Sequence, residues 1–172
     1  DAEQRRPLSV ETAALDLISA SDGTREQRAQ WWIEALRQCL ANTDSAVRQS
    51  VSAIGVSGQQ HGFVPLSADG EVLSPVKLWC DTSTETECRE ISTAFGDDAR
   101  CLEELGNAIL PGYTASKIRW LKNHRPQDYS RLATILLPHD YLNFYLTGER
   151  AMEYGDASGT GLLDIRQRRW HA

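Results

Sequence analysis

Short apolar runs alternate with longer amphipathic segments along this chain of 172 residues. Residues 51–58 (VSAIGVSG) form a nearly continuous apolar run, which is typical of a strand covered on both faces, and residues 133–137 (ATILL) form another. Residues 26–42 instead place apolar side chains, including Trp32 and Cys39, at helical spacing. This order of strands and helices predicts an α/β domain with a mixed sheet and helices on both of its faces.

The rest of the chain continues the same alternation. The further elements that we expect are a strand at 7–18, a hairpin at 63–79 that turns at Asp69-Gly70, helices at 82–96, 114–124 and 138–148, and a strand pair within 151–165. No repeat, low-complexity tract or linker interrupts this pattern, so we expect a single domain.

The charge balance argues against two classes of partner. Eighteen basic and 24 acidic residues give a formal net charge of −6, which favours neither a nucleic-acid partner nor an anionic membrane. No apolar run approaches the roughly 18 residues of a membrane span, and the first ten residues lack the apolar core of a signal peptide. The cysteines have no metal-binding spacing, so we expect reduced thiols and a cytoplasmic protein; they are Cys39, Cys80, Cys88 and Cys101.

Three hydrogen-bonding side chains follow the apolar run at 51–58. Gln59, Gln60 and His61 stand between Gly58 and Gly62, where the backbone leaves one predicted strand and enters the next. Such side chains can simply satisfy backbone groups of a turn. Three in succession at a strand exit also supply donors and acceptors to a hydroxylated ligand without adding charge. The stretch therefore predicts a binding site for a polyol or a sugar.

A second polar stretch follows the predicted hairpin. Trp79 ends the returning strand, and Asp81 follows where a helix is expected to begin. One interpretation is a core tryptophan beside an N-cap carboxylate. The other is a ring that covers the C–H face of a sugar beside a carboxylate that accepts from its hydroxyls. A third stretch, residues 111–117 (PGYTASK), places Tyr113 and Lys117 at the start of a helix but predicts little by itself.

Together these stretches resemble the FGGY family of carbohydrate kinases, and within it the group of xylulose kinases. The segments that carry the resemblance are REQRAQWW, GVSGQQHG, LSPVKLWCDTST, LPGYTASKIRWLKNHRPQDYSR, LLPHDYLNFYLTGE and DASGTGLLDIRQRRW, in that order. They span nearly the whole chain. Two positions depart from the family pattern, since Cys80 stands where Asn is usual and Ser83 where Arg is common.

The resemblance implies a ribonuclease-H-like or actin-like domain of a two-domain kinase. That enzyme would transfer the γ-phosphoryl group of ATP, with Mg²⁺, to D-xylulose and form D-xylulose 5-phosphate. The site residues implied are Gln60 and His61, which hold sugar hydroxyls, Asp81, which accepts from one, and Trp79 and Tyr113, which wall the pocket. Lys117 is given no role. A small sugar is the expected partner, and a homodimer is compatible with the resemblance.

The same resemblance implies that residues 1–172 are a partial N-terminal, sugar-binding domain. The family's first strands, with their phosphate-binding turn, and its ATP-binding domain with the catalytic Asp have no counterpart here, so we expect no catalytic residue, no metal ligand and no bound ATP or Mg²⁺ in this chain. Asp22-Gly23-Thr24 is interpreted as an ordinary loop, and Asp156 as part of a structural strand turn. Two alternatives stay open: a kinase for another ketose or polyol, and a sugar-binding module without catalysis.

Overall fold

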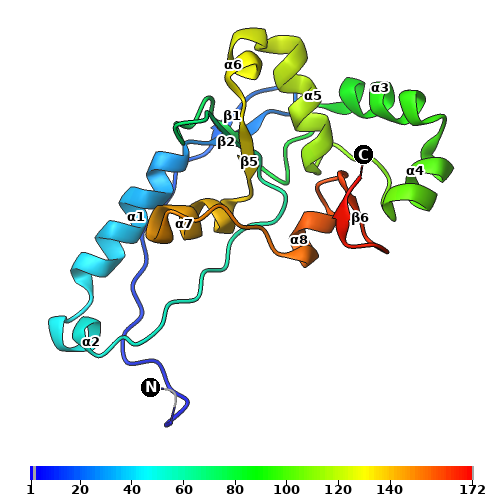
Figure 1. Cartoon of the computed structure of the whole chain (residues 1–172). Coiled ribbons are helices and arrows are strands. Elements are labelled where there is room, and N and C mark those ends of the chain that lie inside the picture. The colour runs from blue at the N-terminus through cyan, green and yellow to red at the C-terminus, as the bar shows by residue number, and fades with distance from the viewer. Residues whose placement is uncertain (2, 172) are drawn as a thin grey trace.

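The computed structural model describes residues 1 and 3–171 and is drawn in Figure 1. Its helices are α1 (Ala29–Asn42), α2 (Ser45–Gln49), α3 (Glu85–Phe95), α4 (Asp98–Leu105), α5 (Thr114–His124), α6 (Pro126–Arg131), α7 (Pro138–Thr147) and α8 (Tyr154–Ser158). Its strands are β1 (Ile18–Ser19), β2 (Arg25–Gln27), β3 (Val64–Leu66), β4 (Val76–Lys77), β5 (Thr134–Leu136), β6 (Leu163–Asp164) and β7 (Arg169–Trp170). Among these residues, no helix is both long and apolar enough to cross a membrane.

The strands of the described residues form three small antiparallel sheets. Their orders are β1-β2-β4, β3-β5 and β6-β7. The register pairs Glu26 with Lys77 in the first sheet and Pro65 with Ile135 in the second. An isolated bridge between Phe63 and Lys77 links the two sheets, so the polar turn that precedes Phe63 lies where they meet.

Two apolar clusters hold these elements together. The first joins α1 to the central strands and consists of Ala29, Trp32, Val64, Leu66, Val76, Leu78 and Leu136. The second lies under α3, α4 and α5 and consists of Cys88, Cys101, Leu105, Ile109 and Ala115. All four cysteines are free thiols, as expected, and burial raises the pKa values of Cys88 and Cys101.

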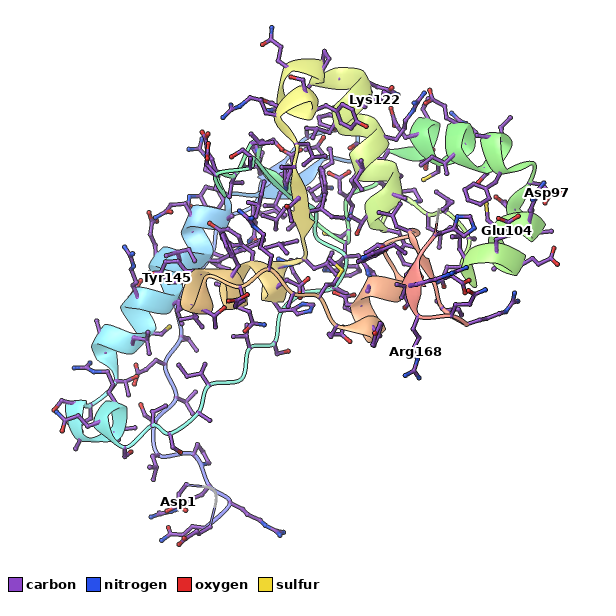
Figure 2. The ribbon with its side chains drawn as sticks, viewed as in Figure 1. Asp1, Asp97, Glu104, Lys122, Tyr145 and Arg168 are labelled. Carbon is purple, nitrogen blue, oxygen red and sulfur yellow. The ribbon has the colours of Figure 1, made fainter. Side chains whose placement is uncertain are left out.

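Helix α7 lies beside α1, as Figures 1 and 2 show. The Nε group of Arg37 on α1 donates to the hydroxyl of Tyr145 on α7 at 2.8 Å, and the Trp32 and Tyr141 rings meet edge to face at 6.3 Å. Only the first turns of α1 are buried in the core, and the start of α7 packs against them. The other end of α1 projects away from the central strands.

The locally encoded elements are confirmed. Helix α5 covers residues 114–124 as predicted, and α1, α3, α7 and β5 lie within the predicted ranges. The turn at Asp69-Gly70 is also confirmed, with Gly70 at a φ of +83°, a backbone conformation that favours glycine. The arms of this hairpin, however, pair mainly with other strands, since β3 pairs with β5 and β4 with β2.

Two predicted strands are wrong in extent. Residues 8–17 and 51–58 contain no strand, and we call them the extended segments, because Figure 1 shows each running as an extended stretch of chain below the body of the domain. Their apolar side chains are exposed: Val10 is 74% exposed and Ile54 67%. A strand needs backbone hydrogen bonds from a neighbour, and no strand described here pairs with either segment. The expected single mixed sheet is therefore replaced by the three small ones.

The strand pair predicted within 151–165 is also wrong in part. Residues 154–158 form helix α8 and only Leu163–Asp164 is a strand, which pairs with β7. The side chain of Glu153 caps α8 by accepting from the backbone N–H groups of Gly155 and Asp156, which is what allows so short and glycine-rich a stretch to be helical. Asp156 consequently lies on a helix, and not in the strand turn expected for it.

Candidate functional site

The turn that carries Gln60 and His61 is fixed by close packing against the start of α7. A Cβ atom added at Gly58 would lie 3.0 Å from the backbone nitrogen of His139, and one at Gly62 would lie 2.5 Å from Cγ of Pro138. His61 itself adopts a φ of +56°, an uncommon conformation for a residue with a side chain. The two glycines therefore allow this turn to pack closely against α7. The left-handed backbone at His61 determines the direction in which its side chain leaves the main chain.

The His61 ring lies among groups from two other segments. Its centroid is 4.7 Å from that of Tyr113, with an interplanar angle of 66°, and its Nδ1 atom is 2.9 Å from Oδ1 of Asp156. A Cβ atom added at Gly159 would fall 2.0 Å from Cε1 of the imidazole. The ring thus fills the space that a side chain at 159 would need, and its position is closely determined.

Lys117 joins two of the predicted stretches. Its side chain is completely buried, and Nζ donates to the carbonyl oxygens of His61 and Gly112, each at 2.7 Å. Burial lowers the pKa of Lys117 to about 7, and the charge of Asp81 acts in the opposite direction. A neutral amine keeps two N–H donors, which matches the two carbonyls that it binds.

Asp81 is buried, and its carboxylate is already bonded to neighbouring backbone and side-chain groups. Its carboxylate accepts from the backbone N–H groups of Arg25 and Ser83, at 2.8 and 3.0 Å, and from the Ser83 hydroxyl at 2.6 Å. The Lys77 ammonium lies 3.3 Å away and also contacts Glu26. A carboxylate offers about four acceptor positions, so Asp81 can take a ligand hydroxyl only in exchange for one of these bonds.

Trp79 is 57% exposed, unlike a core tryptophan. It lies next to the third stretch, because a Cβ atom added at Gly112 would be 2.6 Å from the Trp79 carbonyl oxygen. Its neighbour Cys80 is partly buried against the first apolar cluster. The backbone of the segment that carries Trp79 therefore packs against the main chain of Gly112, next to Tyr113 in the sequence.

Gln60 lines a cavity of about 350 Å³. The lining residues are Val56, Ser57, Gly58, Gln60, His139, Glu153, Gly155 and Asp156. Gln59 points elsewhere and donates to the Gln27 side chain at 3.1 Å, which ties the turn to β2. Of the two glutamines, only Gln60 is free to contact a ligand in this cavity.

The structure thus brings together the stretches at 59–62, 79–81 and 111–117, which the sequence suggested separately. It also adds two residues that were given no part in the site, Lys117 and Asp156. A lysine in the first turn of a helix gives no sign of burial in the sequence, because its burial depends on the two carbonyls contributed by the turns. Asp156 lies in a glycine-rich stretch, and such a stretch can allow close approach of the backbone to another segment. We interpreted that stretch as a strand turn instead.

The Asp22-Gly23-Thr24 stretch is a hairpin turn between β1 and β2, in agreement with the expectation of an ordinary loop. The Asp22 carboxylate accepts from the Thr24 N–H at 2.9 Å, and Gly23 has a φ of +93°. Within residues 1 and 3–171 no group of three His, Cys, Asp or Glu side chains is arranged to hold a metal ion.

Comparisons with known proteins place this geometry in a family. The model of the FGGY family of carbohydrate kinases, N-terminal domain, matches residues 1–172. A xylulose kinase from Haemophilus influenzae is 42% identical over 177 residues, covering 99% of this chain and 36% of that protein. A xylulose kinase from Escherichia coli is 38% identical, covering 98% and 34%. The chain therefore spans about a third of the length of these relatives.

Solved structures give the same result. A xylulose kinase from Brucella ovis superposes with a TM-score of 0.84 at 35% identity, covering 92% of this chain and 33% of that one. A xylulose kinase from Rhodospirillum rubrum gives a TM-score of 0.83 at 26% identity, covering 97% and 36%. These similarities confirm the predicted α/β fold of the actin-like kind. Since the family model matches the whole chain, the chain belongs to the FGGY family of carbohydrate kinases, as an N-terminal domain.

Proposed function

We propose that this chain is the sugar-binding part of an ATP-dependent kinase that converts D-xylulose to D-xylulose 5-phosphate. The observation that carries the proposal is the meeting of three polar stretches, since Lys117 binds the main chain of both His61 and Gly112, and Gly112 packs against the Trp79 carbonyl. The relatives named xylulose kinase support the choice of sugar. Glycerol kinase and gluconate kinase structures have similar folds at about 20% identity, so the fold itself does not select the substrate.

Each site residue has a proposed role. Gln60 and His61 hold sugar hydroxyls, because an amide and an imidazole supply both donors and acceptors. Trp79 and Tyr113 wall the pocket, since apolar rings cover the C–H face of a sugar. Asp81 acts mainly through the chain: by accepting from Arg25 and Ser83 it fixes the segment that carries Trp79, and it would bind a sugar hydroxyl only by releasing one of these partners.

The rest of the kinase is proposed to lie outside the described residues. Phosphoryl transfer depends on positioning and on charge stabilisation around ATP and Mg²⁺, and the described residues contain no group of three His, Cys, Asp or Glu side chains arranged to hold a metal ion. The exposed apolar side chains of the two extended segments support the view that the domain is partial, with further strands pairing there. The four free thiols favour a reducing compartment, so we place the enzyme in the cytoplasm.

The function is tested by measuring ADP release with MgATP and a panel of sugars. The complete kinase should use D-xylulose with a kcat/KM at least about tenfold above those for glycerol and gluconate, because a site that binds several hydroxyls discriminates against a partner that leaves them unpaired. The 172-residue chain alone should release no ADP above background. ADP release by the complete protein that does not depend on D-xylulose would refute the proposal, and turnover by the chain alone would show that the catalytic residues lie within it.

Trp79→Ala separates a pocket wall from a core residue. Because the indole is 57% exposed, we expect the free energy of unfolding to fall by less than about 1 kcal/mol, compared with roughly 3 to 5 kcal/mol for a core aromatic. The KM for D-xylulose should rise while the KM for ATP stays constant. Trp170→Ala, at a 54% exposed tryptophan of β7, is the matched control and should change neither constant. A large loss of stability with an unchanged sugar KM would mean that Trp79 contributes to the core and does not wall the sugar pocket.

A further inference from the structure

Asp156 is a buried carboxylate whose nearest polar neighbours belong largely to His61. Its side chain is 5% exposed, with Oδ1 2.9 Å from Nδ1 of the His61 ring and Oδ2 accepting from the His61 backbone N–H at 3.3 Å. Nδ1 of His139 is farther away, at 3.7 Å, and Nε2 of that ring lies 3.2 Å from Asp140. Asp156 thus contacts both the main chain and the ring of His61.

The contact between the carboxylate and the ring determines where the imidazole proton lies. Nδ1 of His61 and Oδ1 of Asp156 are both buried, and neither makes an aligned hydrogen bond among the described residues, although the two atoms lie 2.9 Å apart. A lone pair on Nδ1 would lie 2.9 Å from the lone pairs of the carboxylate, whereas an N–H there places the positive end of a dipole beside the negative charge. Burying a carboxylate without a donor is unfavourable, so the Nδ1–H tautomer is the one that this pair stabilises.

The remaining ring nitrogen is then an acceptor. Nε2 of His61 makes no hydrogen bond to the residues that the structure describes, and in a neutral imidazole protonated at Nδ1 it carries a lone pair. Contacts with Tyr113 and Gly159 limit rotation of the ring. The backbone beyond α8 is fixed as well, since the Ala115 N–H donates to the carbonyl of Thr160 at 2.8 Å.

We propose that Asp156 is a positioning residue for sugar binding, which holds the His61 ring in place and keeps its proton on Nδ1 so that Nε2 accepts a hydrogen bond from a sugar hydroxyl. The ligand class is therefore a polyhydroxylated sugar that donates a hydroxyl proton to this nitrogen. Asp156 also lines the cavity at Gln60, but the effect proposed here acts through His61. The inference rests on the proposed function for its ligand, but the state of the His61 ring can be measured without any substrate.

Asp156→Asn in the complete kinase tests the proposal by two readouts. With ¹⁵N-labelled histidine, nitrogen chemical shifts should show the Nδ1–H tautomer of His61 in the wild type and a shift toward the Nε2–H tautomer in the variant, because the amide NH₂ group can now face Nδ1. The His61 signals are assigned by their loss in His61→Asn. The KM for D-xylulose should rise about five- to tenfold, the loss expected for one misaligned hydrogen bond, while kcat and the KM for ATP change by less than about twofold.

Asp164→Asn is the control, because this carboxylate accepts from the backbone N–H groups of Arg166 and Gln167 and contacts no histidine. It should leave the tautomer and the sugar KM unchanged. An Nε2–H tautomer in the wild type, or the same tautomer in Asp156→Asn, would overturn the proposal, as would a normal sugar KM in a variant whose tautomer has changed. If the wild type used no sugar, the proposed function would fail, whereas the tautomer measurement would still decide whether Asp156 sets the state of His61.

Discussion

Replacing His61 by Ala in the complete kinase is expected to lower kcat/KM for D-xylulose by about 10- to 100-fold, with less than about a twofold change in the KM for ATP. The expected loss follows from removing a hydrogen-bonding group at a desolvated site, where the sugar hydroxyl that it binds is left unpaired. A sugar analogue that lacks this hydroxyl should be used equally well by the wild type and the variant. Steady-state kinetics with both sugars measure the effect.

Gly159→Ala should produce the same loss without changing any side chain of the predicted site. The added Cβ atom would fall 2.0 Å from Cε1 of His61, so the ring must leave its place. Gly159 has a φ of −79°, which alanine adopts easily, so the substitution acts on the His61 ring and not on the local backbone conformation.

Gly55→Ala is the matched control for this substitution, because no atom lies within 4 Å of the Cβ that it adds. Its kinetics should equal those of the wild type. If both His61→Ala and Gly159→Ala retained normal kcat/KM values for D-xylulose, the Gln-Gln-His turn would have a structural role and no role in sugar binding. The sugar would then have to bind elsewhere.

The second large effect concerns the pH dependence of stability through Lys117. Its pKa is about 7 in the folded protein and 10.5 when exposed, because burial disfavours the charged amine. Between these values the unfolded chain binds more protons than the folded chain, so the stability contributed by Lys117 rises with pH. Below pH 7 the lysine is charged in both states, and the full cost of burying the ammonium is present.

We therefore expect the free energy of unfolding of the wild type, relative to Lys117→Met, to increase by roughly 2 to 3 kcal/mol between pH 7 and 9.5. Urea unfolding at three pH values, followed by tryptophan fluorescence, measures this difference, in which the titration of other groups cancels. Methionine leaves the carbonyls of His61 and Gly112 without a donor, but that loss is the same at every pH.

Lys122→Met provides the control for the lysine substitution, since Lys122 is exposed in a later turn of the same helix and appears at its outer face in Figure 2. Its difference from the wild type should not depend on pH in this range. A pH-independent difference for Lys117→Met as well would mean that the buried amine keeps its ordinary affinity for protons.

The sequence predicted those elements whose signals are local. Helix α5 was predicted to the residue, because Thr114 opens an amphipathic pattern and Pro126 follows its last turn. The extended segments were misjudged, since an apolar run predicts a strand only if a neighbour supplies hydrogen bonds, and nothing in the run itself reveals that neighbour. Helix α8 was missed because its five residues include a glycine and depend on the Glu153 cap.

The candidate site divides in the same way. The turn at Gln60 and His61 could be recognised because three polar side chains between two glycines, after an apolar run, form a local pattern. The burial of Lys117 and the contact of Asp156 with His61 could not, since each depends on segments more than 50 residues apart in the chain. Whether the pocket takes sugar through these residues stays a prediction until the variants are measured.

The extended segments also determine how this chain would behave when produced alone. Their backbone N–H and C=O groups have no strand partners among the described residues, so their amides should exchange with solvent quickly and a protease should cut there first. An unprotected apolar edge is also a template for other chains. At high concentration, copies of this chain would therefore associate through residues 8–17 and 51–58, and charged substitutions at Val10 and Ile54 are the changes most suited to keep it monomeric.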